Sequence, residues 1–110
     1  MNPLRYASIH GKFSQALGDM AESTAPLTKR LEQVFVSHLL PLLAKEFPKE
    51  LQDRFRSLVA AVTEREAEYP GEGRLHATLR HMHPSKAKKI IREIASIEYS
   101  LAHVYYHAED

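Results

Sequence analysis

The sequence predicts an all-α fold: a compact bundle of four to five helices, without a sheet, in a single domain over residues 1–110. Every long segment repeats its apolar residues at steps of three or four, and no useful stretch alternates apolar with polar residues. Apolar types make up 44% of the chain and charged types 26%, as in ordinary globular domains. Six prolines and four glycines are too few, and too well placed, for a flexible linker.

The N-terminal segment predicts the first helix. Asn2 can cap it and Pro3 suits its opening turn. Its apolar positions are Tyr6, Ile9, Phe13, Ala16, Leu17 and Met20. Gly11 and Gly18 fall inside this pattern and weaken the helix by roughly 1 kcal/mol each relative to alanine.

Residues 27–43 predict a second helix that is central to the fold. Ser23 or Thr24 is its expected N-cap. The apolar positions are Leu27, Leu31, Val34, Phe35, Leu39, Leu40, Leu42 and Leu43, and His38 lies on the same stripe. So wide an apolar arc is typical of a helix with neighbours on several sides. Pro41 cannot donate to the Ser37 carbonyl, so we expect the helix to kink or break there.

Two further helices are expected before the last one. Pro48 fits the first turn of a third helix. Charged residues flank its apolar stripe as far as residue 68, so we expect the helix to reach that residue and a loop to follow over 69–73. Its stripe is Leu51, Phe55, Leu58, Val59 and Val62. A short fourth helix over about 74–82 places Leu75, Leu79 and Met82 on one face.

The C-terminal helix has the most regular pattern and is expected to be the longest. Ser85 is its expected N-cap. Its apolar residues step by 3, 4, 3, 4, 3, 4, which is three heptads of an a/d seam. The seam consists of Ala87, Ile90, Ile94, Ile97, Leu101, Val104 and Ala108.

Cysteine content and hydropathy bound the setting of the protein. The chain has no cysteine, which excludes disulfides, thiolate metal sites and a cysteine nucleophile. The N-terminus lacks the basic start and apolar stretch of a signal peptide. The longest apolar run without charges covers residues 34–44, well short of the roughly 20 residues of a membrane span. We expect a cytoplasmic protein without membrane contact.

Charge is balanced overall but segregated along the chain. The chain has fifteen basic and fourteen acidic residues. The acidic residues are concentrated in residues 46–72, and none lies between 74 and 92. The candidate anion-binding residues are Arg74, Arg80, His81, His83, Lys86, Lys88, Lys89 and Arg92. The three lysines of this set lie near the start of the last helix, at the positive end of its dipole. A cation is locally unfavourable there, and such an arrangement beside free helix N–H groups is typical of an anion-binding surface. The plainer alternative is a solvated face that offsets the acidic segment within the fold.

A second candidate surface lies opposite the apolar seam of the last helix. Its residues Arg92, Ser96, Tyr99, His103 and Tyr106 recur at steps of 4, 3, 4 and 3. Tyr and Arg are enriched at interface hot spots, so Tyr99, His103 and Tyr106 are candidate protein-interface residues. The alternative is that these rings pack under the N-terminal helix of the same chain.

Catalytic and metal sites are poorly supported. There is no Gly-x-Ser-x-Gly elbow and no glycine-rich phosphate loop, and the carboxylates fall on polar faces. Seven histidines make a histidine-ligated metal site in the bundle conceivable, with His103 and His107 four residues apart. However, both lie off the seam, and no Glu-x-x-His step occurs. We therefore expect no enzyme, no bound metal and no cofactor.

The function expected from these patterns is that of a small binding or regulatory module. Its first-ranked partner is nucleic acid, contacted through segment 74–92, and an acidic protein surface would also fit. A net charge of +1 and the lack of Phe, Tyr or Trp within 74–92 weigh against nucleic acid. The alternative is a protein–protein adaptor or inhibitor, dimeric through the Tyr/His face, and the next is a metal-binding bundle.

Overall fold

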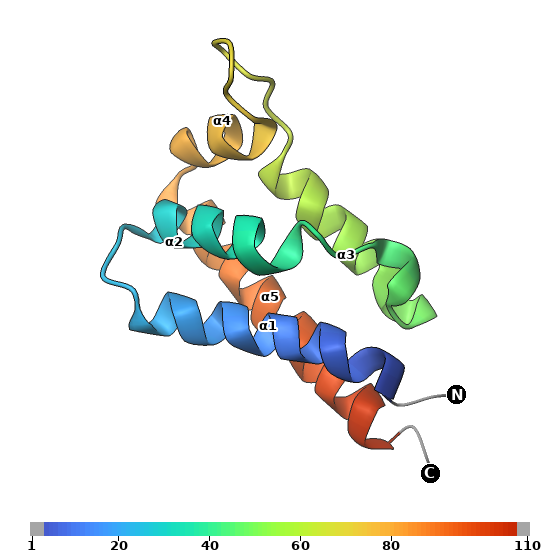
Figure 1. The fold of residues 1–110 in the computed structure, drawn as a ribbon. Coiled ribbons are helices and arrows are strands. Elements are labelled where there is room, and N and C mark those ends of the chain that lie inside the picture. Colours follow the sequence, from blue (N-terminus) through green and yellow to red (C-terminus); the bar gives the residue numbers. More distant parts are fainter. Residues whose placement is uncertain (1–3, 108–110) are drawn as a thin grey trace.

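The computed structural model describes residues 4–107 and the side chains of residues 6–104. Over this range the chain forms helices and no strands, so the predicted all-α class with a long C-terminal helix is confirmed. The helices are α1 (Leu4–Glu22), α2 (Leu27–Val34), α3 (Lys49–Val62), α4 (Arg74–Arg80) and α5 (Pro84–His107) (Figure 1). A π-helical turn, η1 (Phe35–Leu39), continues α2, and a 3₁₀ turn, η2 (Ala44–Glu46), precedes α3.

Helices α1 and α5 form the base of the molecule. They lie side by side and run in opposite directions, with α2 and α3 packed on α5 as well (Figure 1). The a/d seam of α5 is the buried face, as expected: Ala87, Ile90, Ile94, Ile97 and Leu101 are buried and Val104 packs at the edge. Ala108, the last residue of the predicted seam, lies outside the described residues.

Three phenylalanines hold the middle of the core. The rings of Phe47 and Phe55 stack with centroids 4.3 Å apart, and Phe13 of α1 meets Phe47 edge-on at 5.9 Å. These contacts tie α1 to the turn before α3 and to α3 itself. One hydrophobic cluster includes residues from all five α-helices.

Pro41 ends the second helix through a change of helical pitch. The backbone N–H of Leu40 donates to the carbonyl of Phe35 at 2.8 Å, a π-type bond that skips one residue more than an α-helix does. The widened turn accommodates the missing donor of Pro41, and the helix ends at Leu39 with Leu40 as its C-cap. The expected break is confirmed. Val36, Leu40 and Leu43, on either side of the break, are exposed to solvent.

Two expected N-caps are wrong, in both cases because a proline lies at the start of the helix or directly before it. Pro26 occupies the N-cap of α2 without a side-chain bond, and Ser23 Oγ instead accepts the N–H of Ala25 at 3.1 Å. Helix α5 begins at Pro84, whose missing N–H costs nothing in a first turn. The cap falls to His83, whose Nδ1 accepts the N–H of Ser85 at 3.1 Å.

Helix α3 ends at Val62, six residues earlier than the charge pattern indicates. The Thr63 hydroxyl donates to the carbonyl of Val59, and the chain leaves the helix as a loop of residues 63–73, here named the acidic loop. Its four glutamates form tertiary ion pairs instead of lining a solvated helix face. No helix between residues 4 and 107 combines the length and apolarity needed to cross a bilayer.

Gly11 and Gly18 offer a test of the packing of α1. A Cβ added at either position meets no atom within 4 Å, so alanine gains helix propensity without strain. We expect Gly11→Ala and Gly18→Ala each to raise the free energy of unfolding by about 0.5–1 kcal/mol, measured by urea denaturation. Gly71→Ala is the matched control, because its φ of +89° is costly for alanine despite equally open space. A loss of stability in the two helical variants would contradict this packing of α1.

Candidate functional site

The structure divides the eight basic candidate residues into three groups. Four of them pair with carboxylates of the acidic loop: Arg74, Arg80, His81 and Lys86. Lys88, Lys89 and Arg92 are exposed and form no ion pair with any described residue. His83 caps α5 and contacts the Ser85 hydroxyl. Segment 74–92 is therefore not one uniform basic surface.

The acidic loop lies over the start of this segment. Glu66 pairs with Arg74 at 3.5 Å, and Glu64 pairs with Lys86 in the first turn of α5. Glu68 pairs with two residues of the segment: with Arg80 at 3.4 Å and with His81 at 2.7 Å. The charge segregation seen in the sequence is thus partly cancelled within the molecule.

Glu72 fixes the base of the acidic loop, and sequence reasoning missed it. Its side chain is fully buried. Arg80 donates to it through Nε at 2.7 Å and Nη2 at 3.4 Å, and the N–H of Glu68 donates at 2.9 Å. The hydrogen bonds from Arg80, together with that of the Glu68 N–H, lower the pKa of Glu72 to about 2 against the opposing effect of burial. In the sequence it looks like one more turn residue, and only the fold brings Arg80 to it.

The three unpaired cations belong to an exposed strip along α5. The α5 strip, as we name it, consists of Lys88, Lys89, Arg92, Ser96, Tyr99 and His103. These residues recur at helical spacing on the side away from the seam and include no acid. Tyr99 is 74% exposed, which contradicts the alternative that its ring packs under α1. The side chain of Tyr106, the third aromatic-face candidate, lies outside the described residues.

Helix α3 borders the α5 strip on one side. Arg54 reaches from α3 to α5, donating to Glu93 and to the Ser96 hydroxyl at 2.7 and 2.8 Å. A hollow lies on each side of this bridge, of about 260 Å³ beside Lys89 and about 510 Å³ beside Tyr99. The strip is thus flanked by a hollow near each of its ends.

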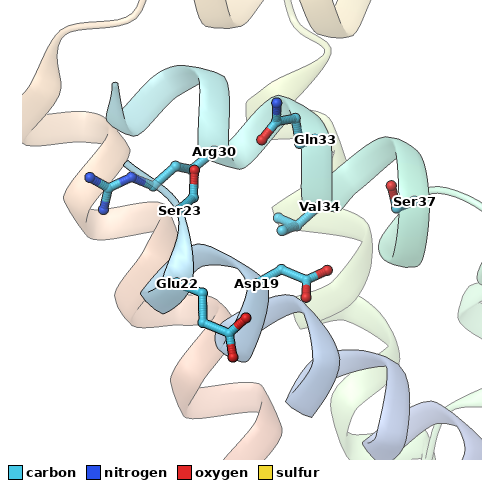
Figure 2. A pocket seen from close by; sticks show the side chains of 7 residues that line it. All are labelled: Asp19, Glu22, Ser23, Arg30, Gln33, Val34 and Ser37. Carbon is cyan, nitrogen blue, oxygen red and sulfur yellow. The ribbon is translucent and has the colours of Figure 1, made fainter. Parts of the chain in front are cut away.

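A separate cavity of about 300 Å³ lies between α1 and α2 (Figure 2). It is lined by charged residues of both signs, including Asp19 and Arg30. Asp19 is already bonded to His38 at 2.7 Å, and Arg30 donates to the Ala25 carbonyl. Figure 2 shows the Arg30 side chain directed away from Asp19, so these charges do not converge on one ligand position.

Most described histidines are engaged by carboxylates. His10 pairs with Glu98, His38 with Asp19, and His81 with Glu68, each at 2.7 Å, and His76 pairs with Glu32 at 3.0 Å. Within residues 6–104 no group of three or more histidine or acidic side chains is arranged to hold a metal ion. His107 lies outside the described side chains. The metal-binding alternative therefore has no ligand set in this part of the chain.

No protein family model, curated protein or solved structure matches this chain. Functional inference therefore depends on its own surface, where the α5 strip combines cations without carboxylate partners and an exposed aromatic ring.

The lowered pKa of Glu72 predicts how stability depends on pH. Because the folded-state pKa is about 2 and the ordinary value is 4.5, ionised Glu72 stabilises the fold above about pH 4.5. This contribution is lost as the pH falls through about 2. We expect Glu72→Gln to lower the thermal unfolding midpoint at pH 7, with the difference from wild type shrinking toward pH 2, as followed by circular dichroism.

The control for this prediction is Glu66→Gln, which removes an exposed carboxylate from the same loop. Surface pairs of this kind contribute little to stability, so its unfolding midpoint should stay near that of wild type at every pH. Equal midpoints for Glu72→Gln and wild type at pH 7 would show that the buried pair does not hold the fold.

Proposed function

We propose that this chain is a non-enzymatic binding module that docks its α5 strip on the phosphate backbone of nucleic acid. The supporting observation is the trio Lys88, Lys89 and Arg92, which is exposed on α5 without a carboxylate partner among the described residues. Arg74 and Lys86, in contrast, each pair with a carboxylate of the acidic loop. A cytoplasmic location, expected from the sequence, is part of the same proposal.

The spacing of the strip suits a polyanion. Arg92 lies three residues after Lys89 and four after Lys88, so the three charges share one helix face. Tyr99 follows on the same face about 10 Å further along the axis, at 1.5 Å per residue. A base of a nucleic acid strand that follows the helix could stack on its ring, which supplies the aromatic contact that segment 74–92 lacks.

The number of unpaired cations on the strip sets how strongly binding depends on salt. With three phosphates neutralised, the logarithm of the duplex association constant should fall against the logarithm of salt concentration with a slope of about −2.7. All eight candidate basic residues together would give a slope of about −7 if fully charged. The proposal is therefore for weak binding that is moderately sensitive to salt.

The test is fluorescence anisotropy of labelled duplex and single-stranded DNA, titrated with protein between 50 and 200 mM salt. We expect a slope near −2.7 for wild type with duplex DNA and loss of binding in the variant K88Q/K89Q/R92Q. The variant K12Q/K49Q/R56Q is the matched control, because it removes the same charge from exposed positions outside the α5 strip. An equal loss in both variants would reduce the effect to net charge and remove the strip from the interface.

A protein–protein adaptor is the second candidate function, using Tyr99, His103 and Tyr106, with a homodimer as its simplest form. Its support is the 74% exposure of Tyr99 next to the hollow of about 510 Å³. An exposed tyrosine beside a concave surface is a common anchor at protein interfaces.

Self-association tests this second candidate. If Tyr99 anchors a dimer, Tyr99→Ala should raise the dimer dissociation constant at least tenfold, a loss typical of an interface hot spot, in sedimentation equilibrium. Val36→Ala, which trims another exposed apolar side chain, should leave that constant unchanged. A wild-type protein that sediments as a monomer at every concentration would remove the homodimer.

A further inference from the structure

We propose that the acidic loop competes with the polyanion. It acts as a strap whose carboxylates pair with cations that a phosphate backbone would otherwise contact. This inference rests on the proposed function and adds a way in which nucleic-acid binding is regulated. It assigns a role to a segment that sequence analysis treats as a continued helix and an ordinary turn.

The outer glutamates of the loop, at 64, 66 and 68, pair with candidate anion-binding residues. Glu66 holds Arg74, and Glu68 holds Arg80 and His81. Glu64 holds Lys86, which stands two residues before the first unpaired lysine of the α5 strip. The loop therefore covers the basic segment up to the point where the strip begins.

A carboxylate and a phosphate offer a cation the same kind of partner, a negatively charged oxygen that accepts hydrogen bonds. A loop carboxylate already neutralises the residue with which it pairs, and it repels a phosphate brought to the same cation. Polyanion binding at Arg74 and Lys86 is thus strengthened when the loop carboxylates are displaced.

The loop is attached in two different ways, and this makes displacement possible without unfolding. Its base is fixed by the buried Glu72 and by Thr78, whose hydroxyl accepts the N–H of Arg65 at 2.9 Å. Its outer pairs are solvated: the side chains of Glu64 and Glu66 are 54% and 84% exposed. Solvated pairs are weak and are screened by salt, so the outer contacts can exchange while the base stays in place.

Arg80 is the exception among the covered cations. It is bonded to the buried Glu72 as well as to Glu68, and Glu72 raises the pKa of Arg80 above its ordinary value. Release of the outer pairs therefore leaves Arg80 in place. The cations gained on release are Arg74 and Lys86, which brings the number available to a duplex from three to five.

The experiment compares wild type with E64Q/E66Q, which removes the two carboxylates that hold Arg74 and Lys86. The matched control is E22Q/D53N, which makes the same charge change at exposed positions away from the acidic loop. The measurement is duplex DNA anisotropy between 50 and 200 mM salt, with circular dichroism to verify that each variant is folded. We expect tighter binding only in E64Q/E66Q, with a slope of about −4.5 instead of about −2.7.

Raising salt from 50 to 200 mM should weaken wild-type binding about 40-fold and the binding of E64Q/E66Q about 500-fold. An equal gain in E22Q/D53N would assign the effect to net charge and overturn the strap. An E64Q/E66Q variant that binds like wild type would overturn the strap while leaving the proposed function intact. Failure of all three proteins to bind DNA would overturn the proposed function, and the strap with it.

Discussion

The packing of α5 on α1 is the constraint from which the candidate surface follows. An isoleucine seam at period 3.5 buries one side of α5, with Ile94 and Ile97 fully enclosed. Since a helix of this kind has only one such side, the residues directly opposite the seam face solvent. The cations at 88, 89 and 92 and the ring of Tyr99 are on the surface because the isoleucines are inside.

The second organising interaction is a single buried charge. Glu72 is acceptable in the interior only because Arg80 and a backbone N–H satisfy its oxygens. By holding the base of the acidic loop against α4, it determines which basic residues meet internal carboxylates. The sequence shows an acidic stretch followed by a basic one, whereas the fold superposes the two and leaves only part of the basic charge unopposed.

The fold was more predictable from the sequence than the site. The burial of Ile90 and Leu101 follows from spacing alone, because helical periodicity is a local property. The ion partners of Arg74 and Lys86 do not follow from spacing. They depend on the third helix ending at Val62, although residues 64–68 would also suit a helix. The same reason explains the N-caps: Ser85 is a good cap in isolation, but the helix begins at Pro84, two residues earlier than a Ser85 cap would allow. The number of cations left without an internal carboxylate is thus set by the tertiary fold.

The two-part attachment of the acidic loop has a consequence for the motions of the molecule. A segment that buries few side chains and is secured by solvated pairs opens at a lower free energy than the core beneath it. If the outer pairs open as the proposed strap requires, the start of α5 becomes bare while the bundle stays intact. A polyanion could then bind this form without any rearrangement of the helices.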